Sequence, residues 1–339
     1  MLKADLIAVG VIGTGRAGQV HVANFAQNVP GARLVAVCDL NADSAREVAG
    51  KWGVEAYSKP EDLLKITSLD AVVISTPTFS HAELVITAAN AGKAILCEKP
   101  LAITEEEAAA MDEAVRRNSV PFVMAFMRRF DLSFNRARNM IRRGDIGEPL
   151  VVKSTGKGPG LPPPWNLDIK KSNGMLAEVN SHDFDCVRFL TGEEYKWVFA
   201  AARNNKCPDF KTEYPDFYDT AIVTFGMSGK VMGTIDGACP ADYGYDARVE
   251  IQGAGGVLFI GNIAQKGVVV GRKGSGVTEE IVDSWRSLFR EAYLAEDRCL
   301  VDCLLKGATP PSTLEDGRRA LQAVRAANRS ILSGKVEQL

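Results

Sequence analysis

Glu178 and His182 have the residue types and spacing that acid–base chemistry requires. An unperturbed histidine titrates near neutrality, so its ring can both accept and release a proton. The pair lies within residues 174–190, a stretch that predicts one continuous helix, and positions four apart share one helix face. A carboxylate one turn away orients the ring, so the pair fits removal of a proton from a hydroxyl group. Glu–His pairs at this spacing also occur as simple solvated contacts.

Metal binding is a competing interpretation that the sequence disfavours. The chain has three histidines, His21, His81 and His182, which are far apart, and none lies at ligand spacing near Glu178. Seven cysteines without a CxxC pair indicate neither a zinc ribbon nor a disulfide framework. We therefore expect no metal.

Lys99 is the second candidate catalytic residue. It follows the apolar residues 94–97 in the sequence Glu98-Lys99-Pro100. If that segment is a strand of a parallel sheet, Lys99 lies at its carboxyl edge, where ligands bind. An ammonium group there stabilises a developing alkoxide. The alternative is a surface lysine paired with Glu98.

A glycine-rich turn, Gly13-Thr14-Gly15-Arg16-Ala17-Gly18, lies between an apolar segment at 7–12 and a predicted helix at 21–27. This order of strand, G-x-G-x-x-G turn and helix is typical of dinucleotide binding. Gly13 permits the tight turn, Gly15 lets the backbone approach a pyrophosphate, and Gly18 lets helix and strand pack closely. The helix N-terminus then binds the pyrophosphate.

Asp39 ends a second apolar segment, 34–38, about 20 residues after the glycines, where the dinucleotide fingerprint expects an acid. Its carboxylate can accept hydrogen bonds from the adenosine ribose and would repel a 2′-phosphate. This predicts NAD in preference to NADP, although Arg46 is near enough in sequence to accommodate a phosphate.

Further cofactor contacts are expected where the third and fourth strands end. The predicted cofactor-binding residues are Gly13, Thr14, Gly15, Arg16, Ala17, Gly18, Asp39, Thr76, Pro77, His81, Glu98 and Lys99.

The order of elements predicts two domains. Predicted strands and helices alternate along the first part of the chain: strands at 34–38, 70–75, 94–97 and 122–126, and helices at 42–52, 60–64, 82–91 and 104–118. This alternation predicts an α/β domain over 1–128 with a Rossmann-type, doubly wound parallel sheet. Residues 129–339 are expected to form a substrate and oligomerisation domain, an α/β domain with an open, mainly antiparallel sheet. Its strands are predicted at 197–202, 220–225, 231–236, 248–252, 257–260 and 268–271, and its helices at 133–142, 285–306 and 314–332. The last helix either stays with the second domain or packs back on the first.

The composition is that of a globular protein and excludes several classes. Of 339 residues, 46% are hydrophobic and 24% charged, and the net charge is −2, so no basic excess points to nucleic acid. No apolar run reaches the length of a membrane span. The first five residues do not resemble a signal peptide, and the expected location is the cytoplasm.

Several motifs recur in the same order in the Gfo/Idh/MocA oxidoreductases, and the chain resembles this family over nearly its whole length. They are residues 13–18, Asp39, Glu98-Lys99-Pro100, Phe126-Met127-Arg128-Arg129-Phe130-Asp131, Ile146-Gly147-Glu148-Pro149 and Glu178-x-x-x-His182-Asp183. Two further stretches, 243–246 and 249–253, are most similar to those of members that oxidise inositol.

The resemblance implies roles for individual residues. Lys99 matches the family's active-site lysine, His182 its acid–base histidine, and Arg128 a position that contacts substrate hydroxyls. Tyr243 or Tyr245 matches a tyrosine over the pocket. The resemblance also implies a dimer or tetramer that forms through the outer face of the second domain's sheet.

Two departures from the family pattern concern the substrate. Glu178 stands where members that act on inositol have aspartate, which moves the carboxylate by about an ångström, a shift that affects catalysis. The loop at 158–168 differs as well, and its Trp165 and Asn166 are predicted substrate contacts, with Trp165 either stacking on a sugar ring or packing the loop.

The predicted function is NAD-dependent oxidation of a secondary hydroxyl of a cyclic polyol or sugar, with an inositol, a hexose and a glycoside all open as substrates. One alternative is transient oxidation by bound NAD during elimination or glycoside cleavage. Another is a non-catalytic protein that senses the nucleotide, against which the presence of Lys99 and His182 argues.

Overall fold

The computed structural model describes residues 6–272 and 276–339, and the chain divides into two compact units. The first holds the residues up to Phe130 together with Glu291–Leu321, and the second holds Asp131–Arg290 with Gln322–Leu339. The sequence predicted a single change of domain at 128/129. Residues 129, 130 and 291–321 instead group with the first unit, because Leu300 and Val301 are buried in its core.

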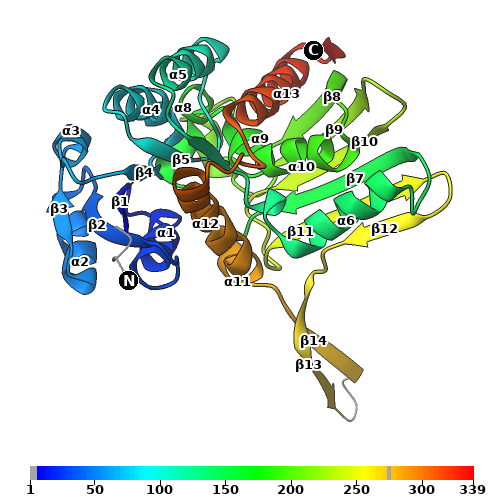
Figure 1. Ribbon diagram of the computed structural model, residues 1–339. Coiled ribbons are helices and arrows are strands. Elements are labelled where there is room, and N and C mark those ends of the chain that lie inside the picture. Colours follow the sequence, from blue (N-terminus) through cyan, green and yellow to red (C-terminus); the bar gives the residue numbers. More distant parts are fainter. Residues whose placement is uncertain (1–5, 273–275) are drawn as a thin grey trace. The chain divides into compact units, whose positions relative to one another are not determined.

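The first unit is built on a six-stranded parallel sheet with strand order β3-β2-β1-β4-β5-β6 (Figure 1). Its strands are β1 (Ile7–Ile12), β2 (Ala32–Cys38), β3 (Glu55–Tyr57), β4 (Ala71–Ile74), β5 (Ala94–Glu98) and β6 (Phe122–Ala125). This is the strand order of dinucleotide-binding sheets, and it confirms the predicted doubly wound fold. The order reverses between β1 and β4, so the loops after these strands border the crevice in which such sheets bind ligands.

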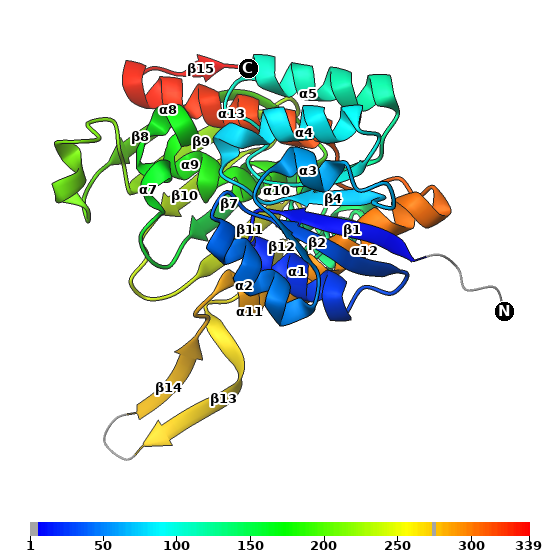
Figure 2. The same cartoon turned by 90° about the vertical axis from the view of Figure 1, so that its left-hand side faces the viewer.

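Helices cover both faces of this sheet. They are α1 (Gly18–Gln27), α2 (Ala42–Trp52), α3 (Pro60–Leu64), α4 (His81–Asn90), α5 (Glu105–Asn118), α12 (Arg290–Lys306) and the first turns of α13 (Leu314–Ser333). On β4, Val72 and Ile74 join one buried cluster while Ala71 and Val73 join another, so the two clusters lie on opposite faces. The first cluster includes side chains of α3, α4 and α5, and the second includes those of α1, α2 and α12. Figure 2 shows α4 and α5 side by side.

The sequence signals for helix ends are confirmed at several places. Asn41 caps α2 by accepting from the Asp43 and Ser44 N–H groups, and Gly53 ends that helix in the left-handed region at φ 67°. Thr104 and Glu107 form the predicted capping box of α5.

The second unit contains a seven-stranded sheet of order β12-β11-β7-β10-β9-β8-β15. Its strands are β7 (Pro149–Lys157), β8 (Tyr195–Arg203), β9 (Thr220–Met227), β10 (Met232–Ala238), β11 (Asp246–Gly253), β12 (Val257–Ile260) and β15 (Glu337–Gln338). All neighbours are antiparallel except β7 and β10, which confirms the mainly antiparallel sheet. Strands β13 (Ala264–Arg272) and β14 (Gly276–Ile281) pair as a separate hairpin that stands away from this sheet (Figures 1 and 2).

The helices of the second unit are α6 (Leu132–Arg143), α7 (Pro164–Leu167), α8 (Ile169–Ser172), α9 (Gly174–Glu178), α10 (Ser181–Thr191), α11 (Trp285–Leu288) and the remainder of α13. Helix α10 packs on β7 and on α6, so one face of the sheet supports the segment that carries His182.

Two predicted helices are interrupted. The helix expected over 174–190 ends at Glu178, and α10 begins at Ser181, so the prediction of one helix was wrong. The reason is Asn180, whose side chain donates to the Gly156 carbonyl of β7 (3.1 Å) and to Asp183 Oδ2 (2.9 Å). The helix expected over 285–306 is divided into α11 and α12. Among the described residues, no helix is long and apolar enough to cross a membrane.

Candidate active site

The glycine loop has the geometry that a dinucleotide requires. Gly13 has φ +95°, and a Cβ there would lie 2.3 Å from the carbonyl oxygen of Ser75, which follows β4. A Cβ on Gly18 would lie 1.9 Å from the Gly13 carbonyl oxygen. A Cβ on Gly15 meets nothing within 4 Å, so the backbone faces open space there. Each glycine therefore does what the fingerprint assigns to it, and the loop fits a pyrophosphate.

Asp39 lies beside this loop at the end of β2. Its Oδ2 accepts from the Thr14 N–H and the Thr14 hydroxyl, both at 2.8 Å, and its Oδ1 accepts from the Asn41 N–H at 2.9 Å. A carboxylate offers about four acceptor positions, so Asp39 retains capacity for a ribose hydroxyl. Arg46, the residue that could accommodate a phosphate, is exposed and pairs with Asp43.

His81 does not face a ligand with its ring. The side chain is 1% exposed, Nδ1 lies 2.8 Å from the Pro100 carbonyl oxygen, and Nε2 lies 2.9 Å from the Thr76 carbonyl oxygen. Burial lowers the pKa of His81 against the opposing effect of these carbonyls, and a neutral ring donates only one of the two bonds. Both ring nitrogens lie against carbonyl oxygens of the protein, so a contact of His81 with the cofactor would use other atoms of this residue. Thr76 and Pro77, in the same loop, are half-buried.

Glu98 is also turned inward. It is 4% exposed, its Oε1 lies 3.3 Å from His21 Nε2, and its Oε2 accepts from the Lys99 N–H at 3.1 Å. The carboxylate is therefore engaged within the first unit, which differs from its predicted role as a cofactor ligand. Lys99 itself is half-buried at the end of β5, and the Lys99–Pro100 peptide bond is cis.

Arg128 and Arg129 follow β6 in the short 3-10 turn Met127–Arg129. Arg128 is 2% exposed, so its long side chain is enclosed. Arg129 donates to the Pro311 carbonyl oxygen and to Asp316 Oδ1, both at 2.8 Å, and so ties the turn to the start of α13.

His182 lies in the first turn of α10, in the second unit, and is 6% exposed. The neighbouring Asp183 is fully buried and accepts from the Ser154 hydroxyl of β7 at 2.6 Å and from Asn180 at 2.9 Å. A Cβ on Gly156 would lie 2.0 Å from Asp183 Oδ2, so a glycine is required where the helix meets the strand. These contacts fix the start of α10 and with it His182.

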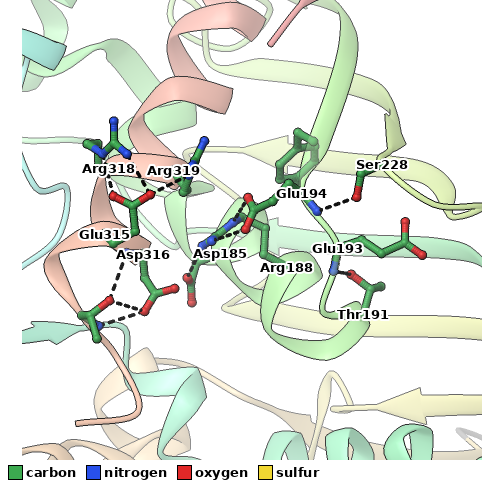
Figure 3. A network of polar contacts seen from close by, with 12 residues as sticks. Asp185, Arg188, Thr191, Glu193, Glu194, Ser228, Glu315, Asp316, Arg318 and Arg319 are labelled. Atoms are coloured by element: carbon green, nitrogen blue, oxygen red, sulfur yellow. Dashed lines mark hydrogen bonds and ion pairs between the residues drawn. The ribbon is translucent and has the colours of Figure 1, made fainter. Parts of the chain in front are cut away.

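The end of α10 is held by an ion pair. Figure 3 shows Arg188 reaching Asp185 and Glu194. Its guanidinium donates two hydrogen bonds of 2.7 Å to the Glu194 carboxylate, a bidentate geometry that is stronger than a single contact. The helix that carries His182 is thus attached at both ends.

The break between α9 and α10 changes the argument for Glu178. The two residues do not share one continuous helix, because residues 179 and 180 form a turn between α9 and α10. A role for Glu178 in orienting His182 rests on the family resemblance alone.

The predicted substrate residues of the second unit differ in exposure. Trp165 is half-buried on α7, whereas Asn166 is 1% exposed and its Nδ2 has no hydrogen-bond partner among the described residues. Tyr243 is 43% exposed and donates to Asp246 Oδ2 at 2.8 Å. Tyr245 is buried with its ring edge-on to Phe289, at a centroid distance of 6.2 Å.

The sequence analysis missed one group of residues in the first unit. His21, Glu98, Glu296 and Asp297 are all buried and close together, although 276 residues separate His21 from Asp297. No local motif signals this cluster. Asp183, by contrast, is part of the motif Glu178-x-x-x-His182-Asp183, although no role was predicted for it.

Comparisons with known proteins identify the family. A family model described as "Oxidoreductase family, NAD-binding Rossmann fold" (GFO_IDH_MocA) matches residues 7–126, and the "GFO/IDH/MocA C-terminal domain" matches residues 134–259. The chain belongs to the Gfo/Idh/MocA oxidoreductase family.

The similar proteins include several named for inositol. The chain is 35% identical to the scyllo-inositol 2-dehydrogenase (NAD(+)) of Bacillus subtilis, over 98% of this chain and 96% of that protein. It is 34% identical to the myo-inositol 2-dehydrogenase of Thermotoga maritima, over 95% and 96%. A solved structure of scyllo-inositol dehydrogenase from Lactobacillus casei with bound NAD(H) and scyllo-inositol has TM-score 0.90 and 25% identity, and covers 98% of this chain and 99% of that one.

Proposed function

We propose that this protein is an NAD-dependent dehydrogenase that oxidises a secondary ring hydroxyl of an inositol to the ketone. The observation that carries the proposal is similarity to inositol 2-dehydrogenases along nearly the entire chain, in a chain that retains both Lys99 and His182. Relatives named for scyllo-inositol and for myo-inositol are similarly distant, so the isomer is a question for the experiment below.

NAD is the proposed cofactor in preference to NADP. Residues 13–18 would hold the pyrophosphate and Asp39 the adenosine ribose. The Asp39 carboxylate would repel a 2′-phosphate, and Arg46 already pairs with Asp43. When bound, NAD supplies the acceptor for the hydride. Because NAD is a cytoplasmic cofactor, we place the reaction in the cytoplasm.

The protein's own residues would manage the proton and the charge on oxygen. His182 accepts the proton of the hydroxyl, a step that such a base accelerates by about 10²–10⁴-fold. The Lys99 ammonium stabilises the negative charge that develops on the same oxygen. Glu178 assists His182, and the other hydroxyls are bound by residues that include Arg128, Trp165, Asn166, Tyr243 and Tyr245.

A homo-oligomer is proposed on the basis of an exposed apolar face. Strand register puts exposed apolar side chains of four strands on one face of the seven-stranded sheet, opposite α10. They are Phe199, Ile222, Met232, Val257 and Phe259, and Phe259 is 73% exposed. A face of this kind marks an interaction surface, and a second copy of the chain is the proposed partner.

The test is a panel of inositol isomers, hexoses and glycosides, each with NAD and with NADP, followed by absorbance of the reduced cofactor. We expect steady NADH formation with at least one inositol. Product without net NADH would favour transient oxidation. Tight NAD binding without turnover of any substrate would favour a nucleotide sensor.

A further inference from the structure

A buried group of four titratable side chains joins α1, the end of β5 and α12 in the first unit. His21 Nδ1 lies 2.7 Å from Asp297 Oδ1, and His21 Nε2 lies 3.3 Å from Glu98 Oε1. Asn24 Nδ2 donates to Asp297 Oδ2 at 2.8 Å. All of these side chains are less than a tenth exposed, and His21 and Asp297 are fully buried. The imidazole therefore bridges a helix from late in the chain to the turn that carries Lys99.

The geometry favours a charged ring. Both nitrogens of His21 face carboxylates, which when ionised only accept, so the ring donates to both only if it is doubly protonated. Burial opposes that charge, but Asp297 and Glu98 raise the pKa of His21 well above 6.5. Burial would raise the pKa of Glu98, yet the hydrogen bond and charge of His21, with the charge of Lys99, lower it.

Glu296 completes the group. It is fully buried, and neither oxygen has a hydrogen-bond partner among the described residues. Burial, reinforced by the charge of Glu98, raises the pKa of Glu296 well above its ordinary value and so favours the neutral acid. Glu98 and Asp297 are the two acids that contact the His21 ring; burial raises the pKa of Asp297, against the opposing charge and hydrogen bond of His21. The charge of Lys99 also lowers the pKa of Glu98, and the Lys99 backbone N–H donates to Glu98 Oε2 at 3.1 Å.

The same turn is held from its other side by His81. Its ring contacts the carbonyl oxygen of Pro100, the residue after Lys99, and that of Thr76 in the loop after β4. Two buried histidines on two helices thus contact the residues on either side of Lys99.

We propose that His21 is a positioning residue for the dehydrogenase. The imidazolium of His21 is fixed by Asp297 and binds the ionised carboxylate of Glu98. Glu98 in turn accepts from the Lys99 backbone N–H, so His21 helps to fix the position of Lys99. This inference rests on the proposed function where it concerns turnover, but the charged ring itself is a property of the protein alone. A displacement of Lys99 by about an ångström costs on the order of 10²-fold in rate.

The kinetic test compares His21→Gln and His21→Leu with Asn24→Leu. The control removes a hydrogen bond to the same Asp297 from the same helix but leaves the contact between His21 and Glu98 in place. We expect kcat to fall about 10- to 100-fold in His21→Leu and less in His21→Gln, which keeps one donor, with the Kd for NADH within about threefold of wild type. The kcat of Asn24→Leu should stay within about twofold. If kcat falls equally in Asn24→Leu and His21→Leu, then His21 has only a structural role.

The second test reads the charge of His21 without turnover. Because the chain has only three histidines, ¹⁵N-histidine labelling gives signals from three imidazole rings, two nitrogens each, which His21→Gln and His81→Gln assign. We expect both His21 nitrogens to remain protonated at about pH 8, where an ordinary imidazole is neutral. A neutral His21 ring at that pH would overturn the proposal. A stoichiometric divalent metal in the purified protein would also overturn it, because His21, Glu98 and Glu296 could together ligate a metal ion. If no inositol is oxidised by the wild type, the proposed function fails, whereas the NMR result still decides the charge of His21.

Discussion

Replacing Glu296 with glutamine should stabilise the protein relative to wild type, and this advantage should grow as the pH rises. Burial raises the pKa of Glu296 in the folded state above its ordinary value of 4.5. A group of this kind contributes stability below about pH 4.5, and that contribution is lost as the pH rises toward its folded-state pKa. Above pH 4.5 the unfolded chain ionises at this position, whereas the folded chain keeps its proton to a higher pH. Glutamine resembles the neutral acid in shape and has no proton to lose.

The magnitude follows from the proton difference. One proton held only by the folded state changes the free energy of unfolding by about 1.4 kcal/mol per pH unit. Between about pH 5 and pH 7, the advantage of Glu296→Gln over wild type should therefore grow by about 2.7 kcal/mol. The test uses the slope of this stability difference with pH, because any difference in packing between the amide and the acid adds the same amount to it at every pH.

The assay is urea unfolding of both proteins at several pH values, followed by circular dichroism. Glu291→Gln, an exposed position on the same helix, is the matched control, and its difference from wild type should not change with pH. If the difference between Glu296→Gln and wild type is also independent of pH, then Glu296 ionises at the same pH in the folded and unfolded protein, and burial does not raise its pKa.

Three further predictions concern other parts of the molecule. Asp39→Ala should raise kcat/KM with NADP relative to NAD, because the carboxylate that would repel the 2′-phosphate is gone; an unchanged ratio would remove Asp39 from cofactor choice. Gly18→Ala should weaken NADH binding, measured by fluorescence titration, because its Cβ would meet the Gly13 carbonyl oxygen at 1.9 Å, and unaltered binding would contradict the loop geometry. Phe259→Lys should lower the oligomer size in light scattering, since it puts a charge on the exposed apolar face; an unchanged size would exclude that face from the interface.

Much of the first unit could be predicted from the sequence because its signals are local. Continuous apolar strands such as Ala71–Ile74 and the glycines at 13, 15 and 18 define a parallel sheet and its first turn. Strand β3, three residues long with no buried side chain, lacks such a signal and was missed.

The break at Asn180 was not predictable from periodicity. The apolar pattern continues through residues 174–190, and the interruption is caused by bonds from Asn180 to a strand more than twenty residues earlier in the chain. The prediction of one continuous helix over residues 174–190 was wrong for this reason.

The side-chain partners of Glu98 and His81 could not be predicted for a related reason. Both lie at strand or helix ends that border the nucleotide crevice, so position alone favoured ligand contacts. Their side chains instead bond to His21 and to the Pro100 carbonyl oxygen, partners that only the folded chain brings near.

The central claim is that His182 takes the proton from an inositol hydroxyl while NAD is reduced. The most direct measurement is NADH formation by wild type and His182→Ala with myo-inositol and scyllo-inositol at saturating NAD, with NADH binding checked in both proteins. The account predicts turnover by wild type with at least one isomer and a loss of about 10²–10⁴-fold in kcat in the variant, with cofactor binding intact. Equal turnover in the two proteins would contradict it.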